Sequence, residues 1–209
     1  EDREVRALVI TGAGDQTFCS GGSLEQLRQG QVSGAVFNRL AERLAALPIP
    51  KIAAMNGSAY GGGVEIGLCC DYRIGVKGMK AMVPAARFGL CYPVGGMRRY
   101  VTRLGVETAK RLLVLSETLN EAELVRVGYL HEVTEPGALG AAADRMAQHV
   151  AGLGPLAVRA MLRLCEGLAT GDLVERKARQ WAEQCSESSD LQEGLQAALE
   201  KRKPEFRGR

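Results

Sequence analysis

Three glycines at positions 61–63, followed by Glu65, form the part of the sequence best suited to chemistry. They come after an apolar, strand-like run at 52–55 and an Asn56-Gly57 turn, and they precede an apolar, helix-like run. Glycines at such a junction let another group approach bare backbone N–H donors, and the start of a helix adds a partial positive charge. We therefore interpret the segment as an anion-stabilising site with the Glu65 carboxylate beside it.

A second small-residue loop, residues 18–23, offers further backbone donors and opens another helix. Two N–H groups that converge on one oxygen form an oxyanion hole, in which each donor contributes on the order of 3 kcal/mol to a transition state. Such a hole suits a carbonyl or thioester that becomes an enolate. The alternative is structural, with both loops as tight turns that need glycine for packing. Glu65, the best acid or base candidate, has the alternative role of a first-turn acid stabilised by the helix dipole.

Other kinds of site are poorly supported. No Gly-Lys-Ser/Thr sequence follows the glycines, which argues against a P-loop. The two histidines, His131 and His149, lie far in sequence from both loops, so a Ser-His-Asp or Cys-His arrangement is not favoured. The six cysteines form no repeated CxxC pair. We therefore expect no metal site and a reduced, cytoplasmic compartment.

The composition is that of an ordinary globular protein. The 209 residues are 46% hydrophobic and 24% charged, with a formal net charge of +3. Because both signs are interspersed, we expect neither nucleic acid nor a membrane as a partner. No apolar run approaches the ~20 residues that span a bilayer, and the charged first residues do not have the pattern of a signal peptide.

Strands and helices alternate over the first half of the chain, which is the pattern of an α/β domain with parallel strands. Ser33 is the expected cap of one helix, and Pro48 ends that helix. Asp71 follows the helix that begins at the glycine triplet, at the negative end of its dipole, so we expect it to have a donor partner. The predicted strands are 5–11, 51–55, 72–76, 81–83 and 130–133, and the predicted helices are 36–47 and 62–70.

After the Gly95-Gly96 pair the sequence becomes almost entirely helical. Helical periodicity or composition covers 97–104, 106–115, 121–127, 137–153, 155–168, 172–185 and 191–203. We expect residues 1–135 to form an α/β core that is incomplete at its N-terminus. Residues 136–209 are expected to form a helical region that packs on this core or on a neighbouring subunit.

These motifs, in this order, resemble the crotonase superfamily, also called the enoyl-CoA hydratase/isomerase family. The resemblance implies a spiral of ββα units with a C-terminal helical region, assembled as a homotrimer or hexamer. The opening strands and helix of that fold are absent from this sequence. The segments that carry the resemblance are 5–14 with 18–22, 54–65 with Cys70-Asp71, 88–90 with Gly95-Gly96, and 193–194 with 200–206.

The resemblance also implies an acyl-CoA thioester substrate, with coenzyme A as part of the substrate and no permanently bound cofactor. The backbone N–H groups of Gly22 and Gly62 would hold the thioester oxygen, and Glu65 would match the first of two catalytic glutamates. Tyr92 could donate a hydrogen bond at the site, and the alternative is a structural role as a packed aromatic ring. Residues implied at the substrate pocket are Gly61, Gly63, Ala85 and Tyr92, and those implied at CoA are Cys19, Ser20, Leu24, Lys201 and Lys203.

The departures from the family pattern bear on the reaction. The second glutamate of the family falls at Ala85, and alanine can neither donate nor accept a proton. Losing one of two acid/base groups should slow water addition by about 10²–10⁴-fold. Glu25 stands where a lysine often contacts the cofactor, and Ser23 stands where an aspartate is common.

Three functions follow as alternatives. The first is a hydratase-type enzyme that adds water to an enoyl thioester through Glu65 and the two oxyanion donors. The second is a different enolate chemistry on the same scaffold. One form is a malonyl-type acyl-CoA decarboxylase, whose characteristic tyrosine corresponds to Tyr92, whereas its characteristic histidine corresponds to Gly22. The other is an enoyl-CoA isomerase, an interpretation that Ala85 weakens. The third is a non-catalytic acyl-CoA-binding relative.

Overall fold

The computed structural model describes residues 4–31 and 33–209, which divide into two compact units. The first, here called the core unit, comprises residues 9–47 and 51–144. The second, here called the C-terminal unit, comprises residues 145–209 with residues 48–50 and the described residues up to Leu8. The glycine triplet, Glu65 and Ala85 all belong to the core unit.

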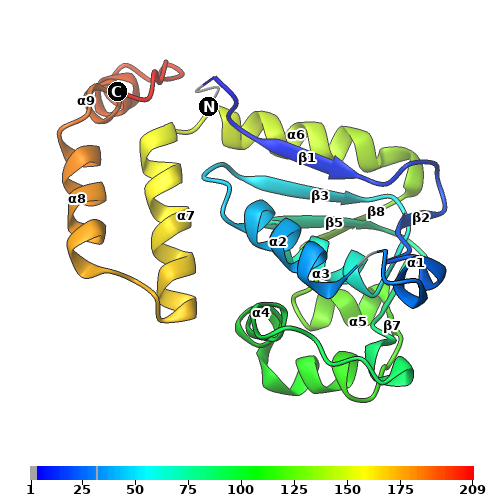
Figure 1. Cartoon of the computed structure of the whole chain (residues 1–209). Coiled ribbons are helices and arrows are strands. Elements are labelled where there is room, and N and C mark those ends of the chain that lie inside the picture. The colour runs from blue at the N-terminus through cyan, green and yellow to red at the C-terminus, as the bar shows by residue number, and fades with distance from the viewer. Residues whose placement is uncertain (1–3, 32) are drawn as a thin grey trace. The chain divides into compact units, whose positions relative to one another are not determined.

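The strands form two four-stranded sheets (Figure 1). In the first, ordered β1-β3-β5-β8, β5 is parallel to both β3 and β8. In the second, ordered β2-β4-β6-β7, only the last pair is antiparallel. These parallel pairs confirm the predicted α/β class. The strands are β1 Leu8–Thr11, β2 Thr17–Cys19, β3 Lys51–Met55, β4 Ser58–Tyr60, β5 Tyr72–Val76, β6 Lys80–Met82, β7 Leu119–Asn120 and β8 Glu132–Thr134.

Helices α2, α3 and α4 of the core unit pack against one another. The predicted cap is confirmed, because the Ser33 hydroxyl accepts a hydrogen bond from the Val36 nitrogen at the start of α2. The helices that begin in this unit are α1 Leu24–Arg28, α2 Gly34–Ala45, α3 Gly62–Cys69, η1 Ala85–Phe88, α4 Val94–Leu113, α5 Glu121–Arg126, η2 Pro136–Ala138 and α6 Leu139–Ala151. Its largest buried side chains are Ile52, Met55, Leu68, Ile74, Met79, Tyr100, Leu112, Leu119, Leu124, Tyr129 and Leu130.

Several elements differ from the expectation. Strand β4 lies between the Asn56-Gly57 turn and the glycine triplet, where no strand was predicted, and β2 and β7 were also missed. All three are too short to show a periodic pattern. The strand predicted at 5–11 begins only at Leu8, and the helix predicted at 191–203 ends at Leu199, before Lys201 adopts a positive φ of 55°. The strand predicted at 130–133 is wrong in its start: β8 begins at Glu132, because the Leu130 nitrogen bonds to the Leu124 carbonyl and closes the turn after α5.

The Asn56-Gly57 turn fastens two connections together. The Asn56 side chain accepts from the Gly12 nitrogen at 2.9 Å and donates to the Gly12 and Gly14 carbonyls at 3.2 and 2.8 Å. A Cβ at Gly57 would collide with the Gln16 carbonyl, so only glycine permits this approach. The turn therefore fixes the segment that leads into β2 beside the start of β4.

Buried charges anchor the end of α3. Asp71 accepts from the Lys51 backbone nitrogen at 2.8 Å and pairs with the Lys51 ammonium group at 2.9 Å, so it has the donor partner that was predicted. The buried Arg73 guanidinium donates to the Cys70 carbonyl at 2.7 Å and to the Tyr129 carbonyl. Arg73 therefore satisfies carbonyl groups at the end of α3, and the Lys51–Asp71 pair holds the residue that follows, so this end of the helix is fixed.

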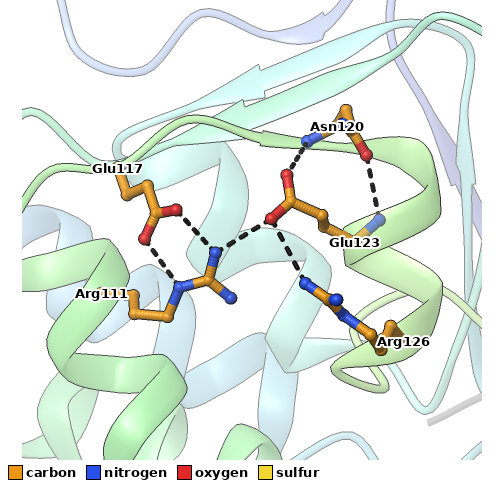
Figure 2. Close-up of polar contacts among 5 residues, drawn as sticks. All are labelled: Arg111, Glu117, Asn120, Glu123 and Arg126. Carbon is orange, nitrogen blue, oxygen red and sulfur yellow. Dashed lines mark hydrogen bonds and ion pairs between the residues drawn. The ribbon is translucent and has the colours of Figure 1, made fainter.

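Helix α4 and the segment after it are tied by a charged network, which Figure 2 shows. Arg111 makes two 2.6 Å hydrogen bonds to Glu117 and one of 2.9 Å to Glu123. Glu123 also completes a capping box with Asn120 at the start of α5. Between these residues Ser116 adopts a positive φ of 48°, and its carbonyl accepts a 2.8 Å bond from Arg87 of η1. The network thus connects η1, which contains Ala85, to the end of α4.

The C-terminal unit contains α7 Pro155–Thr170, α8 Glu175–Ser186 and α9 Ser189–Leu199. Its last residues are packed: the Asp190 carboxylate accepts from the nitrogens of Arg207 and Gly208 at 2.7 and 2.9 Å. The Phe206 ring packs over Gly154 and Gly194, at ordinary contact distance from the place that a Cβ on either glycine would take. Over residues 4–31 and 33–209, no helix is long and apolar enough to cross a membrane.

Candidate functional site

The two glycine segments meet because their strands are neighbours. Strands β2 and β4 run parallel, so their carboxyl ends, which lead into residues 20–22 and 61–63, lie at the same edge of the sheet. Gly21 has a positive φ of 87°, and a Cβ on it would lie 3.0 Å from the Tyr60 carbonyl and 3.7 Å from the Gly62 nitrogen. The loop after β2 is therefore in direct contact with the start of α3.

Close packing explains the glycines at 62 and 63. A Cβ at Gly63 would lie 2.5 Å from the Cys19 carbonyl oxygen, and one at Gly62 would lie 2.9 Å from the Phe37 ring of α2. The N-cap residue of α3 is Gly61, which has no side chain that could cap the helix. The first N–H groups of a helix have no partner within it, so the start of α3 presents bare donors beside the loop that carries Gly22. The packing alternative and the donor alternative are thus compatible at these positions.

Glu65 is in the first turn of α3, as predicted, but it is not directed at open solvent. It is only 1% exposed, and its Oε1 accepts from Nη1 of Arg99, which is itself 9% exposed. Burial raises the pKa of the Glu65 carboxyl, and the charge and hydrogen bond of Arg99 offset part of that rise. The site therefore contains a desolvated acid fixed by a buried cation.

Gly96 and Tyr92 complete the surroundings of the carboxyl. A Cβ at Gly96 would lie 3.1 and 3.2 Å from the two oxygens of Glu65 and 3.1 Å from Cδ1 of Tyr92. The glycine therefore leaves room for the acid and the aromatic ring together. Tyr92 is half-buried, its ring meets that of Tyr100 edge-on at 5.8 Å, and burial raises its pKa.

Ala85 borders the same junction from η1. It follows Pro84, whose Cδ lies 3.9 Å from the place that a Cβ at Gly61 would take. The Gly61 nitrogen bonds to the Met82 carbonyl at 2.9 Å, which keeps the glycine triplet beside this chain segment. Ala85 is 6% exposed and contributes a methyl group, so this position supplies no second acid.

The residues expected at CoA fall into two sets. Cys19, Ser20 and Leu24 lie on the loop that carries Gly22 and on the following helix α1, with Ser20 and Leu24 exposed. Lys201 and Lys203 are exposed residues after α9 in the C-terminal unit. Their part in CoA binding stays a prediction.

His131 is held in a structural setting. Its Nδ1 accepts from the Arg73 nitrogen at 3.0 Å, and its ring stacks on Tyr72 with a centroid distance of 4.6 Å. Burial and the nearby Arg73 charge lower its pKa to about 4. The imidazole is therefore neutral at pH 7. No cluster of three His, Cys, Asp or Glu side chains suited to a metal ion occurs in the part of the chain that the structure describes.

Sequence reasoning missed Arg99, Phe37 and the role of Gly96. Arg99 follows Glu65 by 34 positions, and nothing in that separation indicates a contact. One signal was present: Gly96 directly precedes the predicted helix 97–104, and residues three positions apart share a face where the helix extends back to include Gly96, as α4 does.

Comparison with known proteins identifies the family. A family model described as enoyl-CoA hydratase/isomerase matches residues 1–209. Crotonyl-CoA hydratase of Syntrophomonas wolfei is 32% identical over 99% of this chain and 82% of its own length. Carnitinyl-CoA dehydratase of Proteus mirabilis is 32% identical over 100% of this chain and 84% of its own length.

A solved structure shows the same fold. The crystal structure of enoyl-CoA hydratase from Bacillus anthracis matches with a TM-score of 0.84 at 30% identity, covering 100% of this chain and 84% of that one. The chain belongs to the enoyl-CoA hydratase/isomerase family, within the crotonase superfamily. The resemblance inferred from the glycine motifs is confirmed.

Proposed function

We propose that the chain acts on acyl-CoA thioesters as a hydratase-type enzyme, with coenzyme A present only as part of the substrate. The observation that carries the proposal is the contact between the Gly21-Gly22 loop and the start of α3, beside the buried Glu65. The N–H groups of Gly22 and Gly62 would hold the thioester oxygen. Donors fixed in place before the reaction stabilise the charge that develops on that oxygen.

One carboxylate is sufficient for a balanced addition. Glu65 takes a proton from water while the water oxygen bonds to the β-carbon of the enoyl group. The electrons of the double bond move to the thioester oxygen, which the two N–H groups hold as an enolate. Glu65 then returns its proton to the α-carbon and ends unchanged. Burial raises the pKa of Glu65 toward the working pH, which suits a group that must both accept and donate a proton.

The remaining site residues have proposed places in this scheme. Gly61 and Gly63 keep the backbone close to the thioester, and Ala85 and Tyr92 would border the acyl group. Cys19, Ser20 and Leu24 would border the CoA portion, because they adjoin the loop that carries Gly22. Lys201 and Lys203 would supply positive charge for its phosphates. The names of two relatives, a crotonyl-CoA hydratase and a carnitinyl-CoA dehydratase, support water addition or removal on a CoA ester.

The test is an assay of purified protein against enoyl-CoA thioesters of increasing chain length, followed by the ultraviolet absorbance of the conjugated double bond. We expect that absorbance to fall, and Glu65→Gln to slow the loss about 10²–10⁴-fold. Glu107→Gln, which changes an exposed glutamate on α4, is the matched control and should have no effect. Failure to consume any enoyl-CoA, or turnover of methylmalonyl-CoA alone, would overturn the proposal.

We further propose that the chain assembles as a homotrimer or hexamer through its C-terminal unit. An apolar groove of about 590 Å³ runs between α7, α8 and α9, and Leu195, which lines it, is 55% exposed. Exposed leucines beside an apolar groove favour burial against another subunit. Light scattering should give a trimeric or hexameric mass that Leu195→Glu reduces and Gln192→Glu does not. A monomeric wild-type protein would contradict this assembly.

A further inference from the structure

Helix α4 directs a buried cation at the proposed catalytic acid. Arg99 is 9% exposed and donates from Nη1 to Oε1 of Glu65. A buried charge without a partner is strongly unfavourable, so each side chain needs the other. Gly96, one turn before Arg99, leaves the space into which the carboxyl fits.

The other ionisable groups near Glu65 carry no charge at neutral pH. They are Tyr92 before α4, Tyr100 on α4 and Cys69 on α3, and burial raises the pKa of each, to about 12 for Cys69. From α2, the Phe37 ring lies against Gly62, and the exposed Glu42 carboxylate lies 3.4 Å from the place that a Cβ at Gly95 would take, one residue before Gly96. Arg99 is thus the charged group in direct contact with the Glu65 carboxylate, and it opposes the rise in pKa that burial causes.

We propose that Arg99 is a positioning residue that holds Glu65 by Oε1, keeps it ionised in the resting site, and leaves Oε2 as the oxygen that takes and returns the proton. This inference rests on the proposed hydratase-type function. Its significance follows from Ala85, because no second glutamate at that position shares the proton transfer. Without Arg99 the desolvated carboxyl would bind a proton at neutral pH and could no longer act as a base.

The first test follows the Glu65 carboxyl directly. Protein labelled with carbon-13 at the glutamate carboxyl is titrated by NMR, and the Glu65 signal is identified by its loss in Glu65→Gln. In Arg99→Met we expect Glu65 to titrate at a pH about 1–3 higher than in the wild type, the range that one nearby opposite charge provides. Arg99→Lys should titrate near the wild type. Arg98→Met, which changes the exposed neighbour, is the matched control and should leave the titration unchanged.

The second test is the pH profile of enoyl-CoA turnover. In Arg99→Met the acid limb of the pH profile of kcat/KM should move to higher pH, together with the titration of Glu65. The fall in kcat should be larger than the change in KM. If circular dichroism shows that Arg99→Met does not fold, Arg99→Gln takes its place in both tests. An unchanged Glu65 titration in a folded variant overturns the role of Arg99. A displaced titration in a protein that turns over no acyl-CoA overturns the proposed function instead, and with it the catalytic significance of the pair.

Discussion

Glu65 and Ala85 border the same glycine junction. Glu65 contributes a carboxylate, and Ala85 contributes only a methyl group. The glycine triplet and Glu65 could be predicted because their spacing is local to one strand-to-helix connection. Arg99 could not be predicted, since its contact with Glu65 depends on how α4 packs against α3. At this scale the proposed chemistry rests on a single acid, Glu65.

Installing an acid at Ala85 tests whether the missing group limits the reaction. Ala85→Glu should raise enoyl-CoA hydration by about tenfold or more, because a second acid/base group typically contributes ~10²–10⁴-fold. Ala85→Gln is the matched control, since it adds nearly the same volume without an ionisable proton. An equal increase in both variants, or no change in a folded Ala85→Glu protein, would argue against the assignment.

At the scale of elements, β2 and β4 position the site. Their parallel pairing brings the loop after β2 to the start of α3. The hydrogen bonds of the Asn56 side chain with Gly12 and Gly14 fix the turn that leads into β2. The buried strands β3 and β5 were predictable as continuous apolar runs. Strand β4 was not, although the site depends on it, because three residues carry no periodic signal.

Gly63→Ala tests this contact between elements. The new Cβ would lie 2.5 Å from the Cys19 carbonyl and 2.7 Å from Cys19 Cβ, so β2 and α3 must separate. We expect a loss of about 1–3 kcal/mol in the free energy of unfolding and a fall in turnover of about 10²-fold as one oxyanion donor moves. Gly140→Ala, where a Cβ meets nothing within 4 Å, should leave both unchanged. Equal stability and turnover in Gly63→Ala and the wild type would contradict the described packing.

At the scale of the whole molecule, the chain forms a core unit that carries the glycine junction and a C-terminal unit of helices. The helices were predictable from their periodicity, whereas the packed end of the chain was not, because Asp190 and Phe206 hold it through tertiary contacts. Family membership accounts for this α/β and helical organisation. The central claim concerns what the core unit does with an acyl-CoA.

Exchange of the α-proton tests that claim most directly. If the glycine donors hold an enolate and Glu65 moves the proton, butyryl-CoA incubated with the protein in deuterated water should gain deuterium at its α-carbon. Glu65→Gln should bind the thioester yet exchange it at least about 10²-fold more slowly. Mass spectrometry measures the exchange and calorimetry the binding. Binding without exchange in the wild type, or equal exchange in the variant, would contradict the account.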